Sequence, residues 1–295
     1  MTKVFFCVFL LCTSLLCSQQ TELARLEYSH FPGQNGKNDF QRISTFVDFP
    51  LALKKKGSYF IPRIAYQRFN FGTYDVPIFD QQDFKSFESF QLWLGYTFEM
   101  KRDWRFGFRL GNMISSNFEA NKIVDRDIFY LGLIYFIKSH TGPDVDKPWR
   151  LIIALAYPSI AGKQFTLPVA YYYRKFDPKW SYTVGLPKSD LKHYINKRNI
   201  VQAFIEVEGF FSNIQNTQLI FGEAATEEDL AKISMRFFMS GLGYEHGITQ
   251  NVFLYVNGGY TLSNSFTITD RNQKDAFTIT NKNTFFIKAG ISLKI

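Results

Sequence analysis

Few residues of this chain have the types and spacing of a catalytic site. The chain has four histidines, and the nearest to a nucleophile is His30, which follows Ser29. Neighbouring residues of a β-strand point to opposite faces, so we expect these two side chains to diverge. His140 and His246 fall in expected turns, and His193 lies on an apolar strand face as a packed or rim residue. Because no triad motif is present, we expect no catalytic residue.

Metal and phosphate sites are equally poorly supported. All three cysteines, at positions 7, 12 and 17, precede residue 19, so the remaining chain offers no thiol nucleophile, disulfide or Cys-ligated zinc. Asp144 and Asp146 lack the ligand spacing of a calcium loop. The acidic residues after Thr226 are typical of a helix N-cap followed by a first turn, which predicts a short loop helix. Since no glycine-rich phosphate loop is present either, we expect no cofactor and no metal.

The first 18 residues have the pattern of a secretory signal peptide. Lys3 precedes the uncharged stretch VFFCVFLLCTSLLCS, which is too short to span a bilayer as a helix, and polar residues follow it. We expect cleavage near Ser18 or Gln19, leaving one domain over residues 19–295. A lipoprotein is the alternative, but leucines occupy the positions just before Cys17, where small residues are preferred.

The composition narrows the class of protein further. The 295 residues include 33 Phe, 16 Tyr and 4 Trp, and 46% of residues are hydrophobic, yet the mean hydropathy is −0.14. Disordered chains are poor in aromatic residues, which excludes that class. The net charge of +8 comes from scattered residues, and the longest basic run is Lys54–Lys56. We therefore expect no nucleic-acid partner. No later stretch has the length and apolarity of a membrane helix.

Most of the chain instead alternates between apolar and polar residues with a period of two. In FQLWLGYTFE, residues 90–99, one face carries five apolar or aromatic side chains and the other carries Gln91, Gly95 and Glu99. The segment 104–111 repeats this pattern after a four-residue connection, with Arg105 and Arg109 on the polar face. This pairing predicts a β-hairpin with one apolar face.

Such strands suit either a soluble sandwich or a transmembrane barrel. In a sandwich the apolar faces form the core, whereas in a transmembrane barrel they face lipid and the polar faces line the lumen. The segments are about ten residues long, as tilted membrane-spanning strands require, and aromatic residues gather at their ends. Together with the export signal, these features predict an all-β fold, a transmembrane antiparallel up-and-down β-barrel in the outer membrane of a Gram-negative bacterium.

Fourteen segments qualify as strands, and 190–195 is the weakest of them. We therefore predict 12 to 14 strands in one domain. If both chain ends are periplasmic, the connections 71–85, 116–125, 211–232 and 263–283 lie outside the cell. The connections 100–103, 175–178 and 246–250 then lie in the periplasm. The segments are 22–31, 41–49, 58–70, 86–99, 104–115, 126–138, 149–157, 164–174, 179–186, 190–195, 199–210, 233–245, 251–262 and 284–295.

The last strand carries the most specific pattern. Lys288 and Gly290 are followed by hydrophobic Leu293 and by Ile295 at the terminus, which resembles the C-terminal assembly signal of bacterial outer-membrane barrels. The resemblance implies the barrel-assembly machinery as a partner, besides outer-membrane lipid. The terminal Ile departs from the commoner Phe or Tyr, and an ordinary amphipathic strand is the alternative.

The chain as a whole resembles a family of uncharacterised outer-membrane barrels of similar length that is common in Bacteroidota. The resemblance rests on three stretches: Phe49-Pro50-Leu51, DWRFGFRLGNMISSNF followed by DRDIFYLGLIYFIK, and VGLPKSDLKHYI. The resemblance implies an outer-membrane barrel and supplies no activity.

Three functions remain open. The first is a narrow pore or transport channel with a charged lumen. The second is a structural or interaction barrel whose lumen is closed by ion pairs, and the third is a lipid-modifying enzyme, for which no motif is present. The sequence gives no oligomeric state and no substrate. The polar faces predict these lumen-lining residues: Arg25, Glu27, Arg63, Glu99, Arg105, Arg109, Arg174, Glu206, Glu208 and Lys288.

Overall fold

The fold was obtained as a computed structural model. The predicted signal peptide, Asp144 and the predicted loop helix after Thr226 lie outside the described residues. The described residues are 21–33, 39–72, 85–101, 103–142, 145–158, 165–215, 230–270, 275–280 and 282–295.

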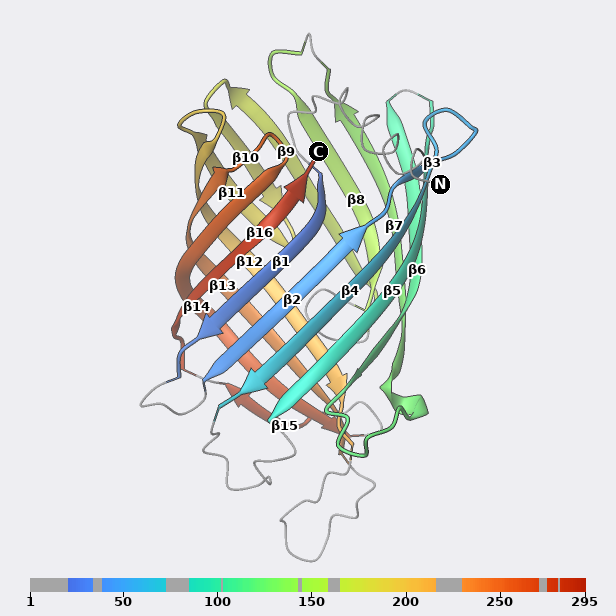
Figure 1. The fold of residues 1–295 in the computed structure, drawn as a ribbon, viewed down its shortest axis with the longest axis vertical. Coiled ribbons are helices and arrows are strands. Elements are labelled where there is room, and N and C mark those ends of the chain that lie inside the picture. The colour runs from blue at the N-terminus through green and yellow to red at the C-terminus, as the bar shows by residue number, and fades with distance from the viewer. Residues whose placement is uncertain are drawn as a thin grey trace, which may run out of the picture.

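The described chain is almost entirely β-structure, and its strands form one closed antiparallel barrel (Figure 1). Fourteen strands make up the ring, in agreement with the predicted number. Pairing of β13 with β14 completes the circuit. The ring strands are β1 (Glu22–Phe31), β2 (Phe40–Asp48), β4 (Tyr59–Phe71), β5 (Ser86–Glu99), β6 (Trp104–Ser116), β7 (Ile128–His140), β8 (Trp149–Tyr157), β9 (Leu167–Asp177), β10 (Trp180–Gly185), β11 (Lys188–Tyr194), β12 (Asn199–Asn213), β13 (Leu230–Gly247), β14 (Val252–Asp270) and β16 (Phe285–Lys294).

Three further elements lie off the ring. The short strand β3 (Leu51–Ala52) pairs with β4, and β15 (Asp275–Thr280) pairs with β14. The 3₁₀ helix η1 (Asp125–Asp127) precedes β7. Among the described residues, no helix is long and apolar enough to cross a bilayer.

The two ends of the barrel differ. The end that holds Thr21 and Ile295, called here the near end, carries the short turns 100–103, 178–179, 195–198 and 248–251. The opposite, far end carries most of the longer connections, with the two-residue turn at 186–187 as an exception, while 49–58 and 141–148 lie at the near end. This distribution confirms the predicted grouping of the connections into two sets.

Strands β13 and β14 are longer than predicted. They contain 18 and 19 residues, against 10 in the neighbouring β16. At about 3.4 Å per residue, the nine extra residues of β14 extend it by about 30 Å past the rim of β16. The segments 211–213 of β12, 230–232 of β13 and 263–270 of β14, predicted to be loop, are strand. These extensions bury apolar side chains, among them Ile233, Phe266 and Ile268.

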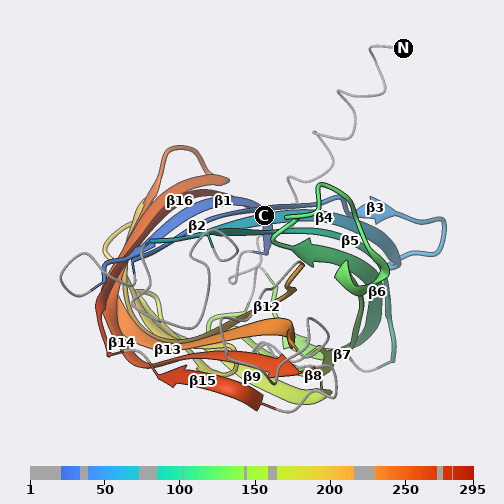
Figure 2. The same ribbon diagram turned by 90° about the horizontal axis from the view of Figure 1, so that it is seen from below.

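On most strands the apolar faces point outward, as predicted. On β5 and β6, Leu94 and Leu110 are 49% and 60% exposed, whereas the inward-facing Phe87 and Ser89 are fully buried. The barrel is flattened in cross-section (Figure 2), so that β16, β1, β2, β4 and β5 form one layer facing β12, β13 and β14. Side chains of the two layers consequently meet inside the barrel.

Candidate functional site

The lumen is the candidate site, and a buried network of charges crosses it. Lys288 on β16 donates to Glu206 Oε1 at 2.5 Å and to Glu208 Oε1 at 2.8 Å, both on β12. Arg42 on β2 contacts Glu208 Oε2 at 2.8 Å and Glu27 Oε1 at 2.8 Å. Since β2 and β16 are not neighbours of β12 in the ring, these pairs join opposite layers. We call Glu27, Arg42, Glu206, Glu208 and Lys288 the lumen network.

Glu27, Arg42 and Lys288 of the lumen network are buried, whereas the Glu206 and Glu208 side chains are 13% and 21% exposed. Lys288 is 1% exposed, and Lys188 approaches the network from β11, with its Nζ 3.9 Å from Glu206 Oε2. With Lys188 included, three cations face three carboxylates. Burial of a charge is tolerated only when it is paired and hydrogen-bonded. This balance therefore stabilises a fixed cross-lumen contact.

A cluster of apolar side chains is buried in the lumen, mostly on the far side of the network. The rings of Phe69 on β4 and Phe210 on β12 lie 3.8 Å apart, and those of Phe40 on β2 and Phe237 on β13 lie 5.3 Å apart. We call this cluster the phenylalanine plug. Its buried members are Phe31, Phe40, Phe69, Phe71, Phe87, Phe204, Phe210, Ile214, Ile233, Met235, Phe237, Met239, Phe266, Ile268 and Phe286.

The far ends of β13 and β14 extend the plug. Phe266, beyond the rim of β16, packs edge-on against Phe71 of β4, with ring centroids 5.7 Å apart. On the other side, the end of β12 reaches β6, where Ser115 Oγ and Ser212 Oγ are 3.0 Å apart. Asn213 also donates to Asp127 Oδ1 at 2.7 Å. Contacts at the far end therefore connect β12 to β6 and η1, as well as β14 to β4.

Two smaller charge clusters line the near half of the lumen. Asp48 accepts from Arg63 Nη2 at 2.6 Å and from Arg109 Nη1 at 3.1 Å. Arg105 pairs with Glu99 at 2.7 Å and donates to the carbonyl of Gly57 at 2.9 Å. The structure thus places all four predicted residues on the inner face, each with a partner.

A third cluster, around Glu245 of β13, includes residues that the sequence analysis did not select. Lys192 of β11 and Lys294 of β16 donate to its two carboxylate oxygens, at 2.9 Å and 2.5 Å. The alternation of apolar and polar residues along β2, β11 and β13 could have identified Arg42, Lys192 and Glu245 as inward-facing. The missing information was which inward positions meet across the lumen.

Arg174 is the exception among the predicted lumen residues, because it lies on the outer face of β9. Its register partners on the neighbouring strands are Trp149 and Tyr182, whereas Val169 and Tyr173 are buried inside at 9% and 3% exposure. The prediction failed because both faces of β9 are apolar or aromatic, so one arginine decided the assignment. Near the end of a strand, a long basic side chain can extend its charged group toward water.

The four residues of the predicted assembly signal have defined positions in the last strand. Lys288 belongs to the lumen network, and Leu293 pairs with Ala24 of β1. Ile295 exchanges backbone hydrogen bonds with Thr21 at 2.7 and 2.9 Å. A Cβ at Gly290 would lie 2.5 Å from the carbonyl oxygen of Leu26 and from the hydroxyl of Tyr255, so only glycine fits there.

Ser29 and His30 diverge, as predicted. Ser29 is buried in the lumen beside Arg42, with its Oγ 3.2 Å from Arg42 Nη2. His30 lies on the opposite face, 3.5 Å from Asp39. Within the described residues, no three His, Cys, Asp or Glu side chains gather as metal ligands would.

Comparisons with known proteins relate the chain to barrels and to one family. The NanC porin aligns with a TM-score of 0.37 and 10% identity, over 93% of this chain and 100% of that one. Outer membrane phospholipase A from Escherichia coli gives 0.36 and 10%, over 95% and 98%. LpxR from Salmonella typhimurium gives 0.37 and 8%, over 92% and 99%. No curated protein matches this chain. The family model described as domain of unknown function DUF6268 matches residues 28–294.

Proposed function

We propose that this chain, which belongs to the DUF6268 family of unknown function, is an outer-membrane barrel with a closed, non-conducting lumen. In this proposal the barrel anchors the elements of its far end at the cell surface and has no enzymatic activity of its own. Its partners are outer-membrane lipid and the barrel-assembly machinery that inserts it.

The outer face supports a membrane location. Large apolar side chains are exposed on strands all around the ring, among them Ile64, Leu110, Ile153 and Leu242. A soluble protein rarely exposes a continuous apolar surface of this kind. A closed barrel also leaves no unpaired strand edge within the ring, which is the condition for spanning a bilayer with β-strands.

Aromatic rings near the near end support the same location. On the outer face, Phe98 packs against Phe106 with centroids 5.6 Å apart, and Tyr172 lies 6.1 Å from Trp149. Such rings are enriched where a membrane meets water.

The observation that carries the proposal is the contact of opposite layers through the phenylalanine plug. Barrels of about eight strands are filled by side chains, and those of sixteen or more hold water channels. The strand number alone therefore does not decide whether this lumen is open. Here the flattened section brings the ring centroid of Phe69 to 3.8 Å from that of Phe210, and the lumen network bridges the same two layers nearer to the near end. Ions would have to displace both contacts, which favours the closed barrel over the narrow pore.

The experiment is conductance in planar bilayers, using the protein refolded from detergent. Insertion is verified first by flotation with lipid vesicles. The wild-type protein is expected to give no stepwise current above that of the bare lipid. The control is Leu94→Ala on the outer face, which leaves the plug unchanged and is likewise expected to give no stepwise current. Reproducible ion-selective steps from the inserted wild-type protein would contradict the closed lumen and restore the narrow pore.

A further inference from the structure

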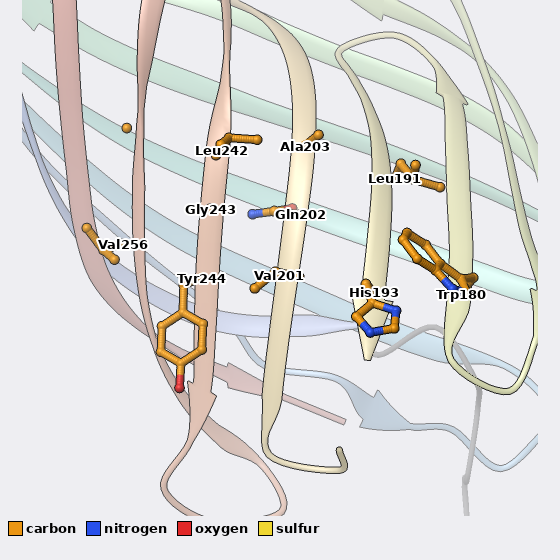
Figure 3. A pocket seen from close by; sticks show the side chains of 11 residues that line it. Trp180, Leu191, His193, Val201, Gln202, Ala203, Leu242, Gly243, Tyr244 and Val256 are labelled. Atoms are coloured by element: carbon orange, nitrogen blue, oxygen red, sulfur yellow. The ribbon is translucent and has the colours of Figure 1, made fainter. Parts of the chain in front are cut away.

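A groove on the outer face of the barrel is separate from the lumen. It has a volume of about 550 Å³, lies over β10 to β14, and is lined mainly by apolar side chains (Figure 3). Its lining includes Trp180, Leu191, His193, Val201, Ala203, Leu242 and Tyr244.

The strand register explains how the groove forms. Ala203 of β12 pairs with Leu191 on one side and with Leu242 on the other. Two residues closer to the near end along β12, Val201 lies between His193 and Tyr244. Strand β12 therefore supplies a floor of small side chains, and β11 and β13 supply taller walls. Figure 3 shows the two rows, with Leu242 and Leu191 flanking Ala203. The long axis of the groove follows β12.

The near end of the groove is aromatic and polar. The rings of Trp180 and His193 are 4.3 Å apart, and Nδ1 of His193 is buried without a hydrogen-bond partner in the described part of the chain. Tyr244 donates from its hydroxyl to Asn199 Oδ1 at 2.5 Å, and Nδ1 of His246 is 2.8 Å from the same oxygen. The apolar groove thus ends in groups that occur where a membrane meets water.

A rigid basic turn lies directly beyond this polar end. Asn196 Oδ1 accepts hydrogen bonds from the backbone N–H groups of Arg198 and Asn199, at 2.8 and 2.9 Å. This arrangement fixes the turn and leaves Lys197 and Arg198 exposed. Lys179 is exposed in the adjacent turn. No salt bridge to Lys179, Lys197 or Arg198 occurs among the described residues, so their charges are available to an anion.

We propose that the groove binds an anionic glycerophospholipid, with one acyl chain along β12 and its phosphate at Lys197 and Arg198. The inference rests on the proposed function, because only a barrel embedded in a membrane presents this face to lipid. An amphiphile fits because the groove is apolar along its length and basic at one end only. With the termini in the periplasm, the ligand belongs to the periplasmic leaflet.

The expected preference for anionic lipid follows from the charges of Lys197 and Arg198. A basic residue near a membrane surface contributes about 1 kcal/mol of attraction to anionic lipid. Two such residues correspond to a preference of about thirtyfold for anionic over zwitterionic lipid. The acyl chain adds affinity for both lipid classes, since its contacts are apolar.

The test is native mass spectrometry of the full chain, reconstituted with an equimolar mixture of phosphatidylglycerol and phosphatidylcholine and released in mild detergent. The wild-type protein is expected to retain one phosphatidylglycerol. Ala203→Trp fills the groove and is expected to retain none. The control Ala170→Trp makes the same change at an exposed alanine on the outer face of β9, outside the groove, and is expected to bind as the wild type does.

A second variant tests the headgroup. Lys197→Gln with Arg198→Gln is expected to keep a lipid but to lose the thirtyfold preference for phosphatidylglycerol. Unchanged lipid retention in Ala203→Trp, or an unchanged preference in the double variant, would overturn the inference. Each variant is first checked for vesicle flotation and for lack of conductance. Failure of those checks in the wild type would instead contradict the proposed function, so the two failures are distinguishable.

Discussion

Replacement of Lys288 by methionine tests whether the lumen network holds the two layers of the barrel together. Lys288 is 1% exposed, and its Nζ lies 2.5 Å from Glu206 and 2.8 Å from Glu208. Methionine keeps most of the side-chain volume and removes the charge. Three buried carboxylates then face only Arg42 and Lys188.

Breaking one partner out of a buried charge pair costs about 3–5 kcal/mol. The unfolding equilibrium constant should therefore rise by roughly two to four powers of ten. The double variant Lys288→Met/Glu208→Gln restores the balance, since Glu27 then faces Arg42 and Glu206 faces Lys188. We expect it to regain most of the lost free energy of unfolding.

The assay is urea unfolding of protein refolded in detergent micelles, followed by the heat-dependent shift of the band on a gel. Refolding in micelles avoids the assembly machinery, so a role of Lys288 in the assembly signal does not affect the result. The control is Lys54→Met in an exposed turn, which should change the free energy of unfolding by less than about 0.5 kcal/mol. A loss below about 1 kcal/mol for Lys288→Met, or no recovery in the double variant, would refute the reasoning.

Three further predictions concern the two faces and the end of the chain. A single cysteine at Arg109 should react with a small water-soluble thiol reagent from the near end, whereas one at Phe108 should be protected by lipid; reversed reactivity would mean that the faces are exchanged. Leu94→Arg, on the outer face, should lower the free energy of unfolding by about 2–4 kcal/mol if it lies near the bilayer midplane, while Leu94→Met should be nearly neutral in the same urea titration. Deletion of residues 293–295 removes the hydrogen bonds between Ile295 and Thr21, and pulse-chase labelling in cells should show degradation of unassembled protein; normal insertion would contradict an assembly role.

The sequence by itself determined the strands and, for most of them, the face that points outward. Along residues 90–98 of β5 and 104–110 of β6, every second residue is large and apolar. The alternation has the same period as the strand, so it specifies the orientation directly. The pattern failed on β9, where both faces are apolar. The predicted strand bounds lie within two residues of the observed ones except on β9, β12, β13 and β14. The last three of these strands continue beyond their predicted ends at the far rim.

Only the tertiary structure decided what occupies the lumen. The sequence places Phe40 and Arg42 on the inner face of β2, and Glu208 and Phe210 on the inner face of β12. It does not say that these strands, five steps apart around the ring, approach each other closely. A circular section would keep those side chains apart in water, whereas the flattened section brings them into contact. Local alternation sets the side of the wall on which a residue lies, but the contacts across the lumen depend on the curvature of the whole sheet, to which all fourteen strands contribute.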